Sequence, residues 1–403
     1  MPTTDYARQN AQALGIRLDR LDMLETRLHA FIESRQRQAI VVRVTKSDEL
    51  IFTGTYGTDT KAYGVRQESI FPLASITKPV IAALLLCLQE DGLVDLNDPI
   101  QRYLPEFTGG GREKIALWHF LTHSSGIFEG ETYTDTEIYL EKEWGIKALW
   151  FGSPEEQREF RKLLCEKMDM DPDNTTGRLS DPYYMLSLRF PIHRDPQTQM
   201  DYCNYGYQRL KNIIDVVTGE PIDDYARRRL FDPLQMPDTY WQVPSDKWER
   251  IIGRNEECTN HEWFNSERCY QSESGAGGLK STAVDITNFA QMILNDGIFD
   301  GKRVLSRYSV LETKKNHNKS IPCVKDYSYS SWGLGWNIRG EKKDDTGILR
   351  PASCMDHSGA GGTKIIVDPE NDMTMAIFSV EYMQDPFFNI AGPLANILYS
   401  ALE

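Results

Sequence analysis

The sequence has strand patterns near both of its ends and helical patterns between them, and this order limits the folds that it can adopt. Near the N-terminus, residues 39–44 are rich in β-branched side chains, and residues 50–56 form a second such run after polar turn residues. Near the C-terminus, residues 332–338, 363–367 and 373–380 also have strand character. We therefore predict an α/β lobe built from both ends of the chain, with a mainly helical lobe inserted between them.

Apolar residues at helical spacing predict the main helices. A long helix begins near Ser75, after a short extended approach over residues 69–72, and ends at Gly92. A polar capping segment, residues 281–285, starts another helix before the C-terminal strands. The other predicted helices are residues 17–34, 207–217 and 393–402.

The composition is that of a globular protein and excludes several classes of function. Hydrophobic residues make up 40% of the 403 residues, which is enough for a sizeable core. The net charge of −14, without any cluster of Lys and Arg, argues against nucleic-acid binding. No apolar run approaches the roughly 18 residues of a membrane-spanning helix. We therefore expect neither a nucleic-acid partner nor a membrane partner, and the sequence specifies no oligomeric state.

The cysteines and the N-terminus predict where the protein works. The seven cysteines are scattered and include no C-x-x-C pair, a pattern typical of reduced thiols rather than of disulfides or a zinc site. The N-terminus is charged throughout and has no apolar stretch like that of a secretory signal. We therefore predict a cytoplasmic protein. His, Asp and Glu show no metal-ligand spacing, so we expect no metal and no cofactor.

Ser75 and Lys78 stand three residues apart at the start of the long apolar helix. Residues at this spacing share one face of a helix, so the hydroxyl and the amine can come within hydrogen-bond distance. Pro79 supports this placement, because proline is tolerated where a helix begins. A serine needs a neighbouring base to become a good nucleophile, and a lysine can serve when burial lowers its pKa. The apolar run after Pro79 provides such burial.

A Ser-x-x-Lys pair alone is a weak signal, because a chain of this length contains roughly one or two by chance. A capping serine beside a solvated lysine would then be the better interpretation. Two further motifs change the balance: Tyr202 and Asn204 form Tyr-x-Asn, and residues 357–359 read His-Ser-Gly. With these motifs in this order, the chain resembles the class C β-lactamase, D-peptidase and related esterase family. The marks of that family are S-x-x-K, Y-x-N and either K-T-G or H-x-G.

The resemblance extends beyond the three motifs and covers about residues 30–400. Three connecting segments also look like those of the family: Leu-Thr-His-Ser-Ser-Gly at 121–126, Ser-Gly-Ala-Gly-Gly-Leu at 274–279 and Gly-Leu-Gly-Trp at 333–336. Each motif is unspecific by itself, whereas together they are highly specific.

The resemblance implies a fold and a division of the chain. The expected fold class is α/β (α+β) and β-lactamase/transpeptidase-like, with an antiparallel sheet flanked by helices from both termini and an inserted, mainly helical lobe. The expected boundaries are an N-terminal helical segment over 1–34 and a catalytic domain over 35–400. Within that domain we expect the α/β lobe over about 35–72 and 300–400, and the helical lobe over about 73–299 with an insert at about 128–200.

The resemblance also implies catalytic roles. Ser75 attacks the substrate carbonyl and becomes acylated. Lys78 and Tyr202 share the general-base and general-acid work, and the sequence leaves open which of them takes the proton. Asn204 bonds Lys78 or the substrate. His357 belongs to the third motif.

The same comparison implies how the substrate oxygen is held. The backbone N–H groups of Ser75 and Ala360 would form the oxyanion hole, and such a donor contributes roughly 3–4 kcal/mol of transition-state stabilisation. Ser358 and Gly359 would border the substrate. We expect glycine at 359, 361 and 362 because the backbone must approach the acyl group closely there.

His357 stands where the lactamases and penicillin-binding proteins carry the lysine of K-T-G, which helps to hold the substrate carboxylate. A histidine is largely neutral at pH 7 unless its pKa is raised. We therefore predict a serine hydrolase that acts on an ester or amide of a small molecule, of the carboxylesterase or D-amino-acid amidase or peptidase type. The alternatives are an acyltransferase of small-molecule biosynthesis and, less favoured, a weak β-lactamase or a non-catalytic binding protein.

Three other features have competing interpretations. His123 with Ser124 or Ser125 could suggest a second catalytic pair, but the absence of a G-x-S-x-G motif favours a structural role in the loop. Cys203 has no activating partner in the sequence, so we interpret it as a packed residue. The aromatic and acidic segment 128–200 is either additional helical packing or a cap that shapes the pocket over Ser75.

Overall fold

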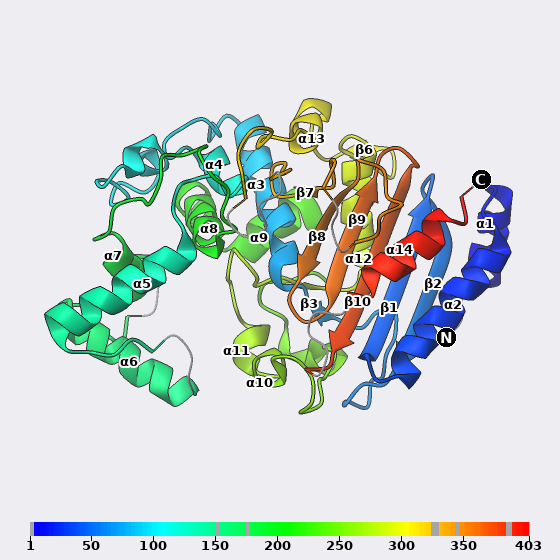
Figure 1. The fold of residues 1–403 in the computed structure, drawn as a ribbon, viewed down its shortest axis with the longest axis horizontal. Helices are drawn as coiled ribbons and strands as arrows, with labels where there is room; N and C mark the ends of the chain where they lie inside the picture. The colour runs from blue at the N-terminus through cyan, green and yellow to red at the C-terminus, as the bar shows by residue number, and fades with distance from the viewer. Residues whose placement is uncertain are drawn as a thin grey trace.

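A six-stranded antiparallel sheet forms the centre of one lobe (Figure 1). The computed structural model describes residues 4–149, 153–174, 178–323, 330–342, 346–383 and 389–402. The strands in spatial order are β2 (Glu49–Gly57), β1 (Arg37–Lys46), β10 (Met373–Glu381), β9 (Thr363–Asp368), β8 (Met355–Gly359) and β7 (Asn337–Ile338). Since β1 pairs with β10, the two ends of the chain build one sheet, which confirms that prediction.

The sheet is buried on both faces, and this explains why its strands are rich in apolar residues without a polar side. Along β1, Ile40 and Val42 point into one core, whereas Ala39 and Val41 point into the other. We call these the outer core and the inner core.

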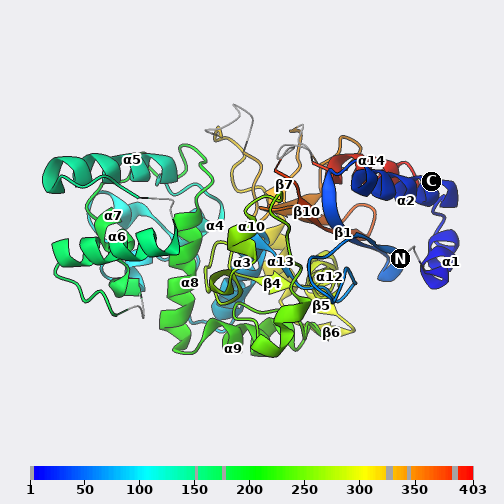
Figure 2. The ribbon, with the colours of Figure 1, turned by 90° about the horizontal axis from the view of Figure 1, so that it is seen from below.

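Helices cover the two faces of the sheet (Figure 2). On the outer core lie α2 (Leu18–Glu33) and α14 (Ala391–Tyr399), which pack against each other, while α1 (Asp5–Ala13) packs against β2. On the opposite face, α12 (Ala283–Leu294) packs against β1, β9 and β10. The helices predicted at 17–34 and 393–402 are thus confirmed to within a few residues.

The inner core joins the sheet to the helical part of the chain through α3 (Thr77–Glu90). All of its residues from Thr77 to Leu88 are buried, and it ends before Gly92, which has φ +70°. Further α-helices follow in chain order: α4 (Leu117–Leu121), α5 (Glu129–Tyr139), α6 (Pro154–Lys167), α7 (Pro182–Ser187), α8 (Asn204–Thr218), α9 (Ile222–Ala226), α10 (His261–Phe264), α11 (Glu267–Tyr270) and α13 (Arg307–Thr313). The short strands are β3 (Phe71–Pro72), β4 (Lys280–Ser281), β5 (Ile298–Phe299) and β6 (Lys302–Arg303).

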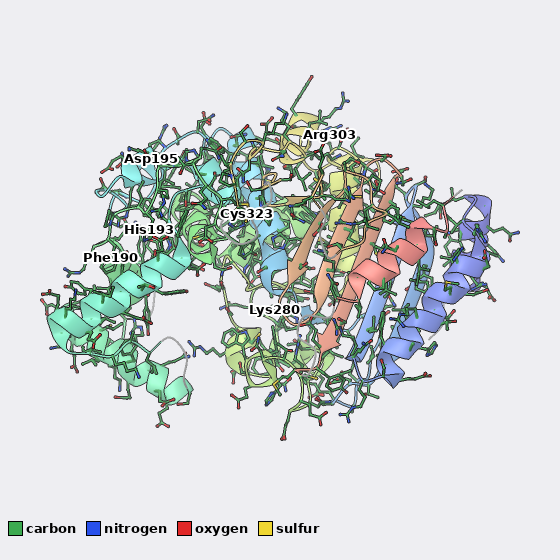
Figure 3. The ribbon with its side chains drawn as sticks, in the orientation of Figure 1. Phe190, His193, Asp195, Lys280, Arg303 and Cys323 are labelled. Atoms are coloured by element: carbon green, nitrogen blue, oxygen red, sulfur yellow. The ribbon has the colours of Figure 1, made fainter. Side chains whose placement is uncertain are left out.

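The segment after α7 contacts both the insert at 128–200 and the chain before it, where the N–H of Ile192 donates to the Gly110 carbonyl and that of His193 to the Gly126 carbonyl, each at 2.9 Å. Phe190, His193 and Asp195 follow one another along it (Figure 3). His193 Nδ1 accepts the N–H of Phe128 at 3.0 Å, and its Nε2 lies 3.1 Å from Asp135 Oδ2 on α5. Asp195 pairs with Lys114 at 2.6 Å.

The division of the chain into lobes at the boundaries given above stays a prediction.

One prediction of local structure was wrong near the third motif. Of the strand expected over 332–338, only β7 forms, because Gly333 donates its N–H to the Trp336 carbonyl at 2.8 Å and closes a turn. Gly335 has φ +81°, and a Cβ there would lie 2.8 Å from the Ala82 side chain, so the turn packs directly on α3. The His-Ser-Gly motif precedes the strand predicted at 363–367, which forms as β9, and itself lies within a further strand, β8.

A buried ionic cluster holds β8 in place. Asp356 accepts hydrogen bonds from Arg350 Nη1 at 2.8 Å, from Lys364 Nζ at 2.5 Å and from Asn337 Nδ2 at 3.0 Å. Burial alone would raise the pKa of Asp356, but the charges of Lys364 and Arg350 outweigh it and lower this pKa to about 2. The carboxylate is therefore ionised at neutral pH and neutralises cations from two neighbouring segments.

No helix in the described ranges is both long enough and apolar enough to cross a membrane.

Replacing Asp356 by asparagine should destabilise the fold. The change leaves Arg350 and Lys364 without their buried counter-charge, and breaking a buried ion pair costs about 3–5 kcal/mol. Urea unfolding should therefore show a lower free energy of unfolding for Asp356→Asn than for the wild type. Asp195→Asn serves as the control, because its exposed pair with Lys114 should contribute little. Equal unfolding midpoints for the two variants would contradict the role of the cluster.

Candidate active site

Ser75 lies on a single 3-10 turn, Ala74–Ile76, that leads into α3. Ala74 has φ +45°, a left-handed conformation that costs a residue with a side chain on the order of 1–3 kcal/mol. Thr77 supports this turn: its hydroxyl donates to the Ala74 carbonyl at 2.7 Å and accepts the N–H of Leu279 at 3.0 Å. The backbone is thus held in a strained shape directly before Ser75.

Lys78 is fully buried one helical turn after Ser75. Its Nζ lies 3.0 Å from Ser75 Oγ and donates to Asn204 Oδ1 at 2.9 Å and to the Ala276 carbonyl at 2.8 Å. These partners come from three separate parts of the chain, which meet around one amine.

Burial lowers the pKa of Lys78 to about 7, although the charge of Glu129 and the nearby Cys203 work in the opposite direction. A large share of the amine is therefore neutral at pH 7. A neutral amine has two N–H donors and one lone pair. Since Asn204 Oδ1 and the Ala276 carbonyl can only accept, they take the two donors, and the lone pair is left for the Ser75 hydroxyl.

The ring of Tyr202 covers the same amine. Lys78 Nζ lies 4.7 Å from the ring centroid, and the phenol shares a hydrogen bond with Ser75. Burial raises the pKa of Tyr202 above its ordinary range, and the hydrogen bond with Ser75 only partly offsets this. The phenol is therefore protonated at neutral pH.

His123 contacts the segment that carries Tyr202. Its ring lies 4.3 Å from the ring of Tyr202, its Nδ1 accepts the N–H of Cys203 at 3.0 Å and its carbonyl accepts the N–H of Asp201 at 3.0 Å. These contacts agree with the predicted structural role. Cys203 is buried, and burial raises the pKa of its thiol, as expected of a packed cysteine.

Asn204 is the first residue of α8, which begins three residues before the helix predicted at 207–217. The first N–H groups of a helix have no partner within the helix. The N–H of Asn204 is one of them, and Glu129 Oε2 accepts its hydrogen bond at 2.7 Å. Glu129, at the start of α5, was missed in the sequence because nothing in its surroundings indicates that it meets α8.

His357 comes from β8 and is almost fully buried. Burial, and next the charge of Lys78, lower the pKa of His357 to about 3, so the ring is neutral at pH 7, as predicted. Nδ1 lies 2.9 Å from the Ser358 carbonyl, which can only accept, so Nδ1 carries the proton and Nε2 is the acceptor. Nε2 has no hydrogen-bond partner in the described part of the chain. The ring centroid lies 6.3 Å from that of Tyr202.

The other residues of the third motif lie at the end of β8. Gly359 packs so closely on the segment before Ser75 that a Cβ would stand 2.1 Å from the Leu73 carbonyl oxygen. Ser358 is exposed, and its Oγ accepts from Lys364 Nζ at 2.8 Å. Ala360 follows as an exposed turn residue.

The neighbouring glycines also have a reason within the protein itself. Gly361 has φ +88°, and a Cβ there would lie 2.7 Å from the Arg254 guanidinium; Gly362 has φ +110°, and a Cβ would lie 2.6 Å from Ser379 Oγ. At both positions the structure requires glycine because of backbone conformation and packing within the protein.

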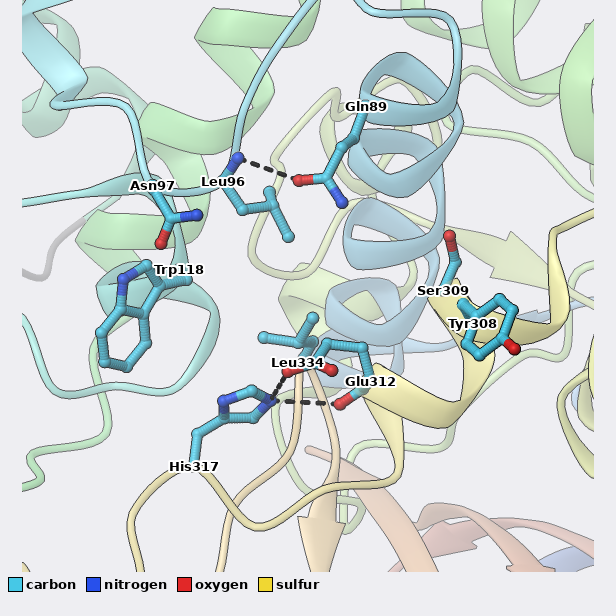
Figure 4. Close-up of a pocket in the computed structure, with 9 residues that line it drawn as sticks. All are labelled: Gln89, Leu96, Asn97, Trp118, Tyr308, Ser309, Glu312, His317 and Leu334. Carbon is cyan, nitrogen blue, oxygen red and sulfur yellow. Dashed lines mark hydrogen bonds and ion pairs between the residues drawn. The ribbon is translucent and has the colours of Figure 1, made fainter.

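Two of the cavities in the helical part of the protein differ in their relation to Ser75. One, of about 500 Å³, lies between α3, α4 and α13 and contains His317 and Glu312, whose Nε2 and Oε1 are 3.7 Å apart (Figure 4). The other, of about 280 Å³, is lined by Asn204 and Ala276, both partners of Lys78. The second cavity therefore lies next to the candidate site.

The described residues hold no group of three or more His, Cys, Asp and Glu side chains suited to a metal ion. The polar groups around Ser75 are an amine, a phenol, an amide and an imidazole. This set can deprotonate a hydroxyl and protonate a leaving group, which is what acyl transfer through serine requires.

Comparisons with known proteins agree with this geometry. The family model described as Beta-lactamase matches residues 24–382. The N-acetylmuramyl-L-alanine amidase of Bacillus subtilis (strain 168) is 22% identical over 386 residues, which cover 84% of this chain and 76% of the relative.

Two solved structures share the fold. A family VIII carboxylesterase superposes with a TM-score of 0.68 at 16% identity, covering 96% of this chain and 98% of the other. EstCE1, described as a hydrolase with promiscuous acyltransferase activity, superposes with a TM-score of 0.67 at 14% identity, covering 96% of this chain and 98% of the other. Because the family model spans most of the chain and these folds match along their whole length, the chain belongs to the beta-lactamase family of hydrolases.

Proposed function

We propose that this protein is a serine hydrolase that forms an acyl-enzyme on Ser75 and cleaves an ester or amide of a small molecule. The observation that carries the proposal is the contact of 3.0 Å between Ser75 Oγ and the buried amine of Lys78, whose pKa is lowered to about 7. A serine beside such an amine can lose its proton at neutral pH, as the nucleophile of acyl transfer must.

In the acylation step, neutral Lys78 accepts the proton of Ser75 while Oγ forms a bond to the substrate carbonyl carbon. The negative charge that develops on the carbonyl oxygen is stabilised by the backbone N–H groups of Ser75 and Ala360. The bond to the leaving group then breaks, and the Tyr202 phenol protonates the leaving atom. The Lys78 ammonium returns its proton to Tyr202, which restores both groups.

In the deacylation step, water replaces the leaving group and the same proton transfers run in the opposite direction. Water loses a proton to the pair of Lys78 and Tyr202, its oxygen adds to the acyl carbonyl, and Ser75 Oγ departs with a proton. A neutral His357 offers an acceptor nitrogen near Tyr202 but no positive charge. This supports esters and simple amides as substrates more than penicillins.

A second candidate is acyl transfer to a small alcohol or amine. It needs the same acyl-enzyme and differs only in the nucleophile that enters, and EstCE1 is described as having both activities. The partition of product between water and an added alcohol distinguishes the two reactions. A non-catalytic binding protein would have no need of a desolvated amine against a serine.

The direct test of the proposed nucleophile is covalent labelling and turnover. A fluorophosphonate should add one adduct to Ser75, and Ser75→Ala should lower the hydrolysis of p-nitrophenyl esters by about 10³-fold or more. Ser124→Ala is the matched control, because it removes the serine next to His123 and should keep most of the activity. An adduct on a different residue, or none on folded wild-type protein, would rule out Ser75.

The pH dependence tests the assignment of the base. The pKa of Lys78 is lowered, and only its neutral form accepts a proton, so kcat/KM should rise with pH and level off above about 7. The profile should be measured with a neutral p-nitrophenyl ester at constant ionic strength. A rise that continues beyond pH 9 would point away from Lys78 as the base.

Removing the hydroxyl of Tyr202 tests its role as the general acid. Tyr202→Phe should lower kcat by about 10²–10⁴-fold, since general acid–base steps typically contribute this much. Tyr207→Phe is the control, because the Tyr207 hydroxyl donates to the Leu121 carbonyl at 2.8 Å and should have only a small effect on kcat. Similar rates for Tyr202→Phe and the wild type would refute the assigned role.

A further inference from the structure

The cavity of about 280 Å³ beside Asn204 extends between α5, α7 and α8. Asn204 and Ala276, which both bond Lys78, form part of its lining. Tyr184, Tyr205 and Arg209 line it as well. The residues of the insert at 128–200 thus contribute a wall to a cavity that adjoins the candidate site.

Arg209 is the cation of this cavity, and it is only 4% exposed. Its guanidinium carbon lies 3.8 Å from the ring centroid of Tyr184 and 5.0 Å from that of Tyr205. The two rings hold the planar group by cation–π contacts, which leave its N–H groups unbonded. Within the described ranges, neither Nε nor Nη1 of Arg209 has a hydrogen-bond partner.

The hydroxyls of both rings are already used, so they do not compete for a ligand. Tyr184 donates to Glu106 Oε1 at 2.9 Å, and the Tyr205 hydroxyl lies 3.1 Å from Ser187 Oγ. Arg209 is therefore enclosed by the two rings, while its buried Nε and Nη1 keep hydrogen-bonding capacity that no described residue uses.

Two carboxylates also line the cavity, and each already accepts hydrogen bonds from the protein. Glu129 accepts from the Asn204 N–H at 2.7 Å and from the Tyr133 hydroxyl at 3.0 Å. Asp181 accepts from the Tyr183 N–H at 3.0 Å at the start of α7. The guanidinium is thus the charged group whose buried donors remain unmatched, and an unmatched buried donor is costly.

We propose that this cavity binds a carboxylate of the substrate against Arg209, so that the natural substrates are esters or amides with an acidic arm. The inference rests on the proposed function of Ser75. A planar carboxylate matches the fork of N–H donors on a guanidinium and forms strong, charge-assisted bonds with it. Arg209 lies five residues after Asn204 on α8, which is roughly 7.5 Å along the helix axis, so the arm needs a spacer of several atoms.

Matched substrates separate the acidic arm from the chemistry. For the acyl side, mono-p-nitrophenyl glutarate is compared with p-nitrophenyl valerate, and for the leaving-group side, 4-acetoxybenzoate is compared with phenyl acetate. The acidic arm lies on either the acyl side or the leaving-group side. For the carboxylated ester of that pair, Arg209→Met should lower kcat/KM by about 10- to 100-fold, as expected from the loss of hydrogen bonds to a charged group. The neutral esters should change little, and Arg209→Lys should retain part of the preference.

Arg189→Met is the control for charge, because Arg189 lies in the insert, stacks on Tyr139 and does not line the cavity. This variant should leave kcat/KM unchanged for both pairs of esters. If Arg209→Met lowers the carboxylated and neutral esters equally, Arg209 only supports the fold and the proposal is overturned.

Binding to the Ser75→Ala protein keeps the two proposals distinguishable. Glutarate should bind this variant in calorimetry, and it should bind at least tenfold more weakly when Arg209→Met is added. If wild-type protein hydrolyses no ester but glutarate binds in this way, the proposed function fails and the acidic pocket stands. If esters are hydrolysed at Ser75 and glutarate does not bind, the acidic pocket fails and the hydrolase stands.

Discussion

The chemistry proposed for this protein depends on keeping the Lys78 amine out of water. An exposed lysine would be protonated at neutral pH and could not accept the proton of Ser75. Here α3 is buried from Thr77 to Leu88, and among the described residues the amine contacts Asn204, the Ala276 carbonyl, Ser75 and the rings of two tyrosines. The charge of Glu129 favours the protonated form, yet burial has the larger effect and brings the pKa to about 7. The sheet, the apolar helix and the loop at 274–279 all contribute to this one environment.

The regular elements could be predicted from the sequence because their signals are local. The strands β1, β2, β9 and β10 and the helices α2, α3 and α14 carry continuous apolar patterns that depend on no distant partner. The strand predicted at 332–338 was wrong because Gly335 packs on the surface of α3, and the residues next to Gly335 in the sequence do not indicate this contact. β8 was missed as a strand because Asp356 breaks its apolar pattern, and only the ion pairs with Arg350 and Lys364 make that charge acceptable inside the fold.

The reacting groups of the candidate site were predictable for a different reason. Ser75, Lys78, Tyr202 and His357 occur in short motifs in a fixed order, and the structure brings these residues together around one amine and one phenol. The residues that bound the adjoining cavity carry no such motif. The residues next to Arg209 in the sequence are those of an ordinary helical arginine. Its burial and its stacked position come from the two tyrosines that enclose it. Substrate preference is therefore the part of function that this sequence encodes only through tertiary packing.

The pairing of β1 with β10 has a consequence for how the protein is made. Arg37 is aligned with Glu381, so more than three hundred residues must leave the ribosome before the central pair of strands can form. Until then, β1 and β2 present an apolar hairpin whose open edge has no partner, which is a hazard for aggregation. Contacts between distant residues also close slowly, because the intervening chain loses entropy first. We expect synthesis of this protein to depend on chaperones that shield the nascent hairpin until the last strand arrives.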